Sequence, residues 1–279
     1  RLKQSFPQIT TTKIHLDPRF PISRKMALNV GIKSAHYECM VFTSTDAVPQ
    51  TDRWLSLMAK GFMRGEIVVG YCGVERGKGF SNYMMRAWRM MHSADWIARA
   101  VRRRAYRGTL HNYGFTKSLY FGANGFSHLN MNIGEDDLFM QRVMTRDNVS
   151  VILSPRASLR EKMWGGMGWW MSQLRYFGSA FRFYPRAVKT FVRWEIGSRV
   201  LFFATVVCAL AVMPPEYKLA ALLLAVIRYV VVAFEVRRIA RRLGEGGIAG
   251  RYFIYDLLGP LWAAALGAML LRRDNRVWR

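Results

Sequence analysis

Hydrophobic positions recur at two different spacings in the first 150 residues. Short apolar runs at residues 37–43 and 66–71 end in polar or turn-forming residues and predict buried strands. Apolar residues at helical spacing predict helices over residues 50–64 and 83–104. Residues 23–32 predict a further amphipathic helix that has a serine as its N-cap. Strands that alternate with helices are typical of an α/β domain.

Residues 159–176 are dense in tryptophan and methionine, with arginine and lysine interspersed. Tryptophan is favoured at the membrane interface because its ring is apolar while its N–H stays hydrated. We therefore predict an amphipathic helix that lies on the bilayer. The alternative is a helix packed on the preceding domain, and the two are compatible on different faces of one helix.

Three apolar segments follow, at residues 200–213, 219–234 and 252–271. The first two are shorter than the roughly 20 residues that a helix needs to span a bilayer. The proline-rich turn between them predicts a helical hairpin whose two arms span the membrane as a pair. Arg228 and Asp256 lie inside apolar runs. They are expected to pair or to line an acceptor path, with snorkelling of Arg228 as the simpler account.

The third segment contains Gly259 and Pro260, which predict a break and therefore a re-entrant or interfacial course. Four arginines at positions 237, 238, 241 and 242 follow the second segment. By the positive-inside rule this end lies in the cytosol. The sequence therefore leaves two or three spanning helices open.

The 279 residues carry a net charge of +24, and 51% of them are hydrophobic. That apolar fraction excludes a disordered basic protein. Excess positive charge is typical of proteins that bind nucleic acid or anionic lipid. The arginine clusters stand beside Trp- and Met-rich runs or at the ends of apolar segments, and no zinc-knuckle, helix-turn-helix or RNA-recognition motif occurs. We expect anionic membrane lipid as a partner and no nucleic acid.

Glu135, Asp136 and Asp137 place three consecutive carboxylates in an otherwise basic chain. They indicate either an acid/base site beside a phosphate-bearing substrate or an acidic helix start. Asp46 follows the strand predicted at 37–43, where ligands bind in open α/β sheets, and a carboxylate there is well placed for a metal-bound diphosphate. Basic residues at a helix N-terminus, as in the segment from residue 24, can hold an anion.

The order of these motifs resembles the inverting family 2 glycosyltransferases of the GT-A type. Arg-Lys-x-Ala-Leu-Asn-x-Gly-Ile-Lys-x-Ala starts at residue 24, a strand then ends in Thr-x-x-Asp at Asp46, Trp54 follows in a helix, and Gly-Glu-Asp-Asp-Leu spans residues 134–138. More particularly, the chain is similar to the bacterial membrane-bound members, in which hydrophobic helices follow the catalytic domain.

The resemblance implies a role for each matching position. Asp136 would be the general base on the acceptor hydroxyl. Asp46 would hold Mg²⁺ or Mn²⁺ on the nucleotide diphosphate, and Ser44 stands where the family has the first Asp of Asp-x-Asp. Glu135 belongs to the same nucleotide-sugar site.

Further contacts to the nucleotide sugar are implied elsewhere. Arg24 and Lys25 match the basic positions before Ala-Leu-Asn. Gln173 and Arg175 stand in the place of Gln-x-x-Arg-Trp, although the arginine is one position early and Tyr176 and Phe177 follow it. The apolar strand and acidic loop that open the family's fold are not in this sequence, and we expect the intact protein to supply them.

The sequence thus predicts an α/β fold class: a partial GT-A, Rossmann-like catalytic domain at residues 1–153, an amphipathic interface segment at 154–195, and a transmembrane region at 196–279. The predicted function is a hexosyltransferase-like enzyme at the inner membrane, with its catalytic domain on the cytoplasmic face. Its donor would be a nucleotide sugar, and its acceptor a lipid-linked or polysaccharide glycan. The alternative is a truncated, non-catalytic membrane scaffold derived from such an enzyme.

Overall fold

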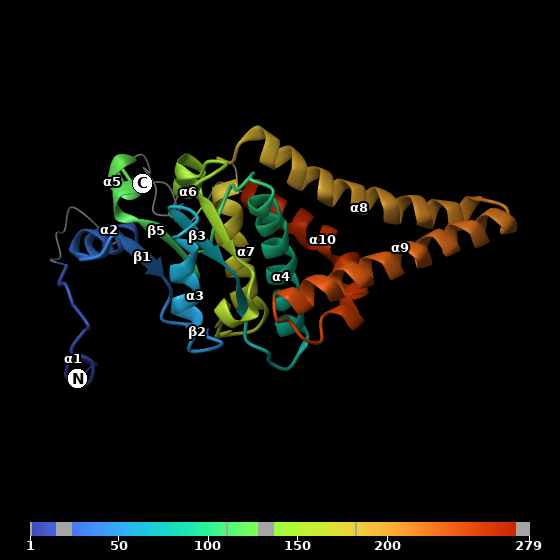
Figure 1. The fold of residues 1–279 in the computed structure, drawn as a ribbon. Helices are drawn as coiled ribbons and strands as arrows, with labels where there is room; N and C mark the ends of the chain where they lie inside the picture. The colour runs from blue at the N-terminus through green and yellow to red at the C-terminus, as the bar shows by residue number, and fades with distance from the viewer. Residues whose placement is uncertain (1, 15–23, 110, 128–136, 182, 272–279) are drawn as a thin grey trace.

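The fold combines a mixed α/β body with a long helical hairpin that projects from it (Figure 1). The computed structural model describes residues 2–14, 24–109, 111–127, 137–181 and 183–271. The N-terminal residues, with the short helix α1 (Leu2–Ser5), lie at the end of the body away from the hairpin.

The larger sheet has four strands in the order β1-β5-β3-β6, namely β1 (Cys39–Phe42), β5 (Tyr113–Thr116), β3 (Ile67–Gly70) and β6 (Val149–Ile152). β5 is antiparallel to both of its neighbours, and β3 and β6 are parallel. β3 is buried along its whole length, as the sequence predicts. β1 is shorter than predicted and only Met40 in it is buried, because it lies at an edge of the described sheet.

A second, three-stranded sheet has the order β2-β7-β4, with β2 (Ala47–Pro49) antiparallel and β4 (Cys72–Val74) parallel to β7 (Leu159–Glu161). The prediction of one helix over residues 159–176 is wrong for its first part. Leu159 and Glu161 are buried between β2 and β4, so this part of the expected interface segment belongs to the α/β body.

Helices cover the sheets. α2 (Arg24–Ser34), α3 (Trp54–Gly61) and α4 (Phe80–Val101) confirm three predicted helices, although the expected N-cap Ser23 lies outside the described residues. α4 packs on β4 and β6 and carries much of the core on one face. The remaining short elements are α5 (Lys117–Gly122), α6 (Leu138–Val143) and the 3₁₀ turns η1 (Pro155–Ala157) and η2 (Ala249–Arg251).

α7 (Met167–Phe181) packs against α4 and α10 through the buried side chains of Trp170, Met171 and Leu174. The alternative of a helix packed on the domain is therefore observed for this face. Ser172 and Arg175 lie on an exposed face, and contact of that face with a bilayer stays a prediction.

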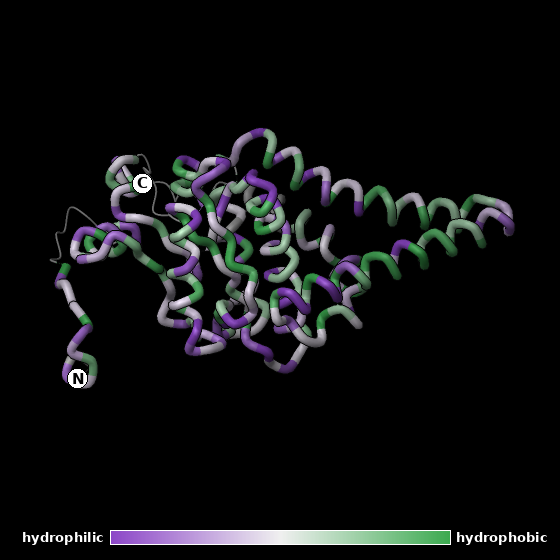
Figure 2. Tube along the Cα trace, in the orientation of Figure 1, coloured by the Kyte–Doolittle hydropathy of each residue, from purple (hydrophilic) through white to green (hydrophobic). Residues whose placement is uncertain are grey.

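α8 (Arg186–Val212) and α9 (Pro215–Arg242) form the predicted hairpin, and they are long and apolar enough to cross a membrane by length and composition. Only 6% of the most apolar window of each helix is buried. Figure 2 shows that hydrophobic residues follow one another along both helices of the hairpin. α8 begins at Arg186 and runs without interruption past residue 195, where the predicted interface segment ends.

α10 (Tyr252–Leu271) is continuous through Pro260, so the predicted break at Gly259 and Pro260 is wrong. Packing explains the difference, because α10 lies against α7, α8, α9 and α4 and Pro260 is buried there. Asp256 of α10 pairs with Arg228 of α9 at 2.6 Å and with Arg199 of α8 at 3.2 Å. The prediction that Arg228 and Asp256 pair is confirmed.

Candidate functional site

One edge of the small sheet gathers three chain segments that carry charged residues. In the register of this sheet Glu161 lies opposite both Ala47 and Val74, so the start of β2 and the ends of β4 and β7 meet. Asp46 precedes β2, and its carbonyl accepts a hydrogen bond from the Lys162 backbone N–H at 3.1 Å. Two segments that lie more than 100 residues apart in the sequence are thereby brought together at Asp46.

Ser44 lies beside a buried polar cluster at the same edge. Its Oγ and His111 Nδ1 form a hydrogen bond of 2.8 Å, and His111 Nε2 lies 3.8 Å from Glu161 Oε2. Arg89 Nη2 of α4 donates to the same Glu161 oxygen at 2.8 Å. The resemblance placed His111 at the start of the segment 111–118, which stands where the family has a wall of the donor site. Its contact with Ser44 joins residues 67 positions apart, too far for a local pattern to reveal.

Burial lowers the pKa of His111 to about 3, and the positive charges of Arg89 and Arg24 act in the same direction. The imidazole is therefore neutral at physiological pH. A neutral imidazole has one N–H donor and one acceptor nitrogen, so it can orient the Ser44 hydroxyl without adding a charge.

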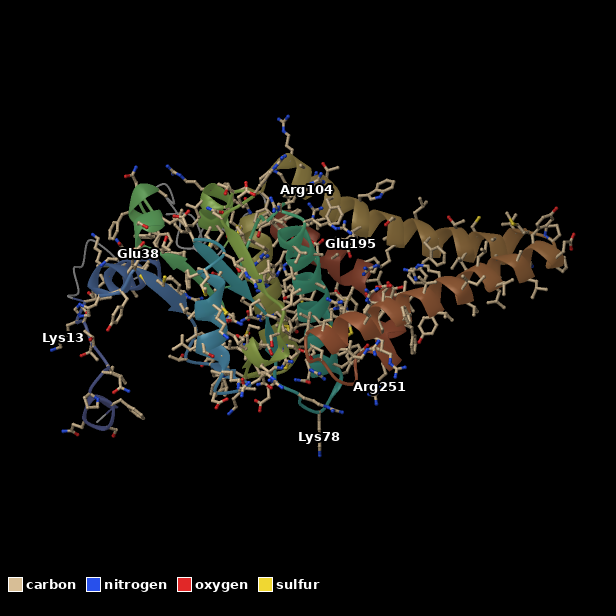
Figure 3. The ribbon with its side chains drawn as sticks, viewed as in Figure 1. Lys13, Glu38, Lys78, Arg104, Glu195 and Arg251 are labelled. Carbon is tan, nitrogen blue, oxygen red and sulfur yellow. The ribbon has the colours of Figure 1, made fainter. Side chains whose placement is uncertain are left out.

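A pocket of about 370 Å³ is formed by residues 75–82 and by Lys162, Met163, Gly165 and Gly166. Asn82 holds the first of these segments, since its side chain accepts from the Gly77 N–H and donates to the Glu75 carbonyl, each at 2.9 Å. Three cations line the pocket, namely Arg76, Lys78 and Lys162. Lys78 projects from its outer rim near the start of α4 (Figure 3).

The N-terminus of α4 also contributes to this pocket. Gly79 is its N-cap with a φ of +93°, a left-handed conformation that favours glycine, and Phe80 and Ser81 of the first turn line the pocket. Backbone N–H groups at a helix N-terminus favour anions. The pocket therefore combines cationic side chains with a helix dipole, and Asp46 adjoins it through its backbone hydrogen bond to Lys162.

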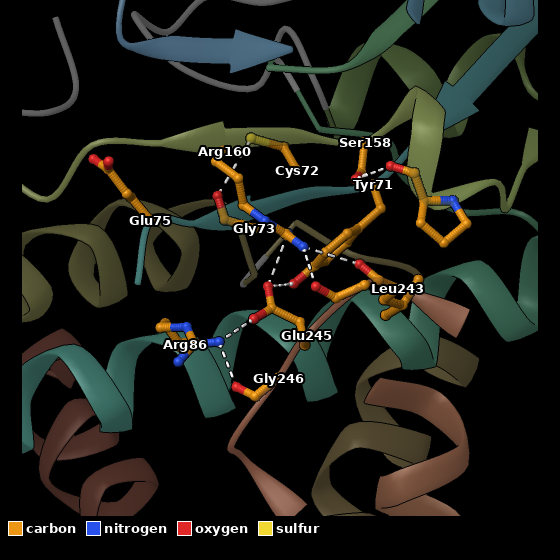
Figure 4. A network of polar contacts seen from close by, with 12 residues as sticks. Tyr71, Cys72, Gly73, Glu75, Arg86, Ser158, Arg160, Leu243, Glu245 and Gly246 are labelled. Carbon is orange, nitrogen blue, oxygen red and sulfur yellow. Dashed lines mark hydrogen bonds and ion pairs between the residues drawn. The ribbon is translucent and has the colours of Figure 1, made fainter. Parts of the chain in front are cut away.

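A second buried network fixes the body to the base of the hairpin (Figure 4). Glu245, which follows α9, accepts from Arg86 at 2.7 Å and from the Tyr71 hydroxyl at 2.8 Å, and its other contact is an ion pair with Arg160 at 2.8 Å. A Cβ on Gly73 would clash with Arg160 Nη1 and Glu245 Oε1, so this position requires glycine.

This network overturns part of the sequence interpretation of α4. In the sequence, the arginines of the helix predicted over residues 83–104 favour a lipid-facing or acceptor-facing surface or a solvated basic face. Arg86 and Arg89 are instead only 6% and 2% exposed and are ion-paired. Their partners, Glu245 and Glu161, stand 159 and 72 positions later in the chain. No local pattern could reveal these pairs.

Of the three consecutive carboxylates, Glu135 and Asp136 lie outside the described residues. Asp137 is the N-cap of α6, and its side chain accepts from the Leu138 N–H and from the Tyr184 hydroxyl, each at 2.7 Å. It is 3% exposed. The interpretation as an acidic helix start therefore holds for Asp137.

Other predicted contacts are more scattered. Lys25 follows Arg24 in the first turn of α2 and is half-buried. Gln173 and Arg175 lie on α7, and among the described residues neither has a hydrogen bond or ion pair with Ser44 or Asp46. Ser44 and Asp46 lie two positions apart after β1, and the assembly of Arg24, Gln173 and Arg175 with them into one site stays a prediction.

The part of the chain that the structure describes contains no group of three or more His, Cys, Asp or Glu side chains that could hold a metal ion. Asp46 is a single half-exposed carboxylate. That donor set fits Mg²⁺ of the kind that binds through one or two carboxylates, substrate phosphates and water, and it does not fit an all-protein metal cage. Comparison with models of known protein families gives no match, and comparison with curated proteins gives none either.

Proposed function

We propose that this chain is a membrane-bound, inverting glycosyltransferase of the family 2, GT-A type that transfers a sugar from a nucleotide-sugar donor to a lipid-linked or polysaccharide acceptor. The observation that carries the proposal is the position of Asp46. It lies beside Ser44 and next to a pocket lined by Arg76, Lys78 and Lys162. A carboxylate near several cations suits a metal-bound diphosphate better than either feature alone.

The reaction would be a single displacement at the anomeric carbon of the donor sugar. A base takes the proton of the acceptor hydroxyl, the oxygen forms a bond to the anomeric carbon, and the bond to the diphosphate oxygen breaks on the opposite face. Asp136 is the residue proposed as base. The diphosphate leaves with the bonding electron pair, and the pocket cations and the N-terminus of α4 would stabilise its negative charge.

Asp46 is the residue that would hold Mg²⁺ or Mn²⁺ together with the diphosphate oxygens. The ion would supply charge neutralisation on the leaving group. Ser44, whose hydroxyl can donate to Nδ1 of neutral His111, would accept a hydrogen bond from the nucleotide in place of the carboxylate that the family has there.

The hairpin supports a membrane location for this enzyme. α8 and α9 pass the criteria of length and composition for spanning, and the arginines at the end of α9 adjoin the body (Figure 1). By the positive-inside rule the body would lie on the cytoplasmic face of the inner membrane. Nucleotide sugars are soluble donors that would reach the pocket from that side.

The test measures sugar transfer and donor binding with the full chain in membranes, using a panel of nucleotide sugars. Asp136→Asn is expected to lower transfer by about a hundredfold to ten-thousandfold while donor binding stays near that of the parent protein. Asp46→Ala is expected to weaken donor binding only when divalent cation is present. Asp52→Asn, which changes an exposed carboxylate nearby, is the matched control.

Two results would contradict the proposal. Transfer by Asp136→Asn within about threefold of the parent protein would remove Asp136 as the base. Donor binding by the parent protein without transfer of any sugar would favour the alternative of a non-catalytic scaffold.

A further inference from the structure

A second pocket lies where α9 joins the body, and Glu245 of the buried network is among its lining residues. Its volume is about 550 Å³, and it is formed by one face of α9 and by the segment that leads into η2. The lining residues of α9 recur at helical spacing and change character along the helix. Tyr229, Ala233 and Phe234 come first, and Arg237 and Arg241 follow.

The cationic end of this pocket has no acid to balance it. Arg237 and Arg241 are exposed, and neither has an ion pair with any residue that the structure describes. Glu245 lines the pocket, but its two oxygens are already used by Arg86 and Arg160. Unbalanced cations at the mouth of a pocket attract an anion.

Glycines form part of the pocket wall that faces α9, and because they have no side chains they do not fill the pocket. Gly246, Gly247 and Gly250 line the pocket, and Gly247 has a φ of +75°, which disfavours any other residue. A Cβ on Gly247 would lie 3.6 Å from Arg76 Nη2, so a third cation borders the same wall. Arg251, at the end of η2, adds a fourth exposed cation close to the base of α9 (Figure 3).

The length of α9 sets the depth of the cations in a bilayer. Residues from Pro215 to Phe234 would span about 30 Å at 1.5 Å per residue, which matches the hydrocarbon core. Arg237 begins less than one turn later, at the level of the head groups. Arg228 would then lie inside the hydrocarbon layer, where its ion pair with Asp256 compensates its charge.

We infer that this pocket binds one anionic phospholipid, with the phosphate on Arg237 and Arg241 and an acyl chain along Tyr229, Ala233 and Phe234. A free anion would contact only the cationic end of the pocket. A phospholipid would contact both ends, because its phosphate carries negative charge and its acyl chain is apolar. The inference rests on the membrane placement in the proposed function but needs no transferase activity. Bound lipid would fix α9 against the body at the network of Glu245.

The experiment measures lipid binding to the purified full chain in a neutral detergent by native mass spectrometry. Phosphatidylglycerol is titrated as the anionic probe, phosphatidylcholine as the zwitterionic probe, and inorganic phosphate as the competitor. The parent protein is expected to retain one phosphatidylglycerol in preference to phosphatidylcholine, and millimolar phosphate is expected not to displace it.

Two double variants separate a site from general charge attraction. Arg237→Gln with Arg241→Gln is expected to weaken phosphatidylglycerol binding by about thirtyfold, which corresponds to about 2 kcal/mol for two cations at a membrane surface. Arg238→Gln with Arg242→Gln makes the same charge change on the same turns but outside the pocket, and it is expected to change binding by less than about threefold.

A third variant probes the apolar half at constant charge. Ala233→Trp fills the pocket beside Phe234 and is expected to weaken lipid binding while the unfolding temperature stays near that of the parent protein. Equal weakening by the two double variants, equal binding of both lipids, or displacement by phosphate would overturn the inference. Loss of sugar transfer alone would contradict the proposed function and leave this result unchanged.

Discussion

The α/β body and the α8–α9 hairpin place charged and apolar side chains in opposite ways. Arg89 and Glu245 in the body are 2% and 4% exposed, whereas Leu219 and Leu223 on the hairpin are 70% and 58% exposed. The buried charges of Arg86 and Arg89 are tolerated in the body because they pair with Glu245 and Glu161 at 2.7 and 2.8 Å. An exposed row of leucine is unfavourable in water and neutral in lipid. The two regions are therefore suited to two different solvents.

The junction between these two regions is built from buried or partly buried ion pairs, like those inside the body. Asp256, Arg199 and Arg228 connect α10, α8 and α9, and Glu245 connects the end of α9 to α4 and β7. Each of these contacts joins elements that are distant in the sequence. The hairpin is therefore held to the body by ion pairs, while its outer part makes few contacts with the rest of the protein.

The largest expected effect is the loss of a buried charge in the body. Glu245→Ala leaves Arg86 and Arg160 without their carboxylate and is expected to destabilise the fold by about 3 to 5 kcal/mol. The measurement is the unfolding temperature in detergent. Glu235→Ala, which removes a half-exposed carboxylate from α9, is the control and should have an effect within about 0.5 kcal/mol. Similar effects of the two substitutions would show that buried pairing does not stabilise the body.

A charged residue placed on the apolar part of the hairpin tests whether that part lies in lipid. Leu223→Arg places a cation near the middle of the apolar part of α9 and should disfavour insertion by about 2.5 to 3.5 kcal/mol. Leu55→Arg is the matched control, since Leu55 is 56% exposed on α3 of the body. The fraction that stays in membranes after high-salt and alkaline carbonate washes should be high for the parent protein and for Leu55→Arg, and lower for Leu223→Arg. Release of the parent protein by salt alone would show that the hairpin does not span.

The smallest of these effects concerns His111 in the body. Its pKa is lowered from 6.5 to about 3, so the unfolded chain binds a proton in this range that the folded protein does not. Stability is therefore lost as the pH falls below about 6.5, by about 2 kcal/mol at pH 5 from this group. Unfolding at pH 8 and pH 5 should show a weaker pH dependence for His111→Asn than for the parent protein.

The control for this measurement is His36→Asn, which removes an exposed histidine. His92 is buried and its pKa is also lowered, so it adds to the acid sensitivity of all three proteins equally. An unchanged pH dependence in His111→Asn would mean that the imidazole does not stay neutral beside Ser44.

Elements with a strong local pattern could be predicted from the sequence. The hairpin, β3, α3 and α4 follow from hydrophobic periodicity over a few residues. The turn between α8 and α9 follows from the two prolines at 214 and 215, because proline cannot continue a helix. Where the pattern was weak, the tertiary structure decided. Leu159, Arg160 and Glu161 have no strong strand pattern of their own, but β2 and β4 lie on either side of them, and so they form the central strand β7.

For the candidate site, the sequence determined which residue types follow which element, and therefore placed Asp46 and Ser44 after β1. It also placed the charges of Arg228 and Asp256 inside apolar runs, where a partner is needed. Only the tertiary structure selected their partners, because contacts such as those of Ser44 with His111 and of Arg86 with Glu245 join residues 67 and 159 positions apart. Local preferences are set by neighbours within a turn or a strand, whereas a buried charge takes whichever opposite charge the packing of distant elements brings within about 4 Å.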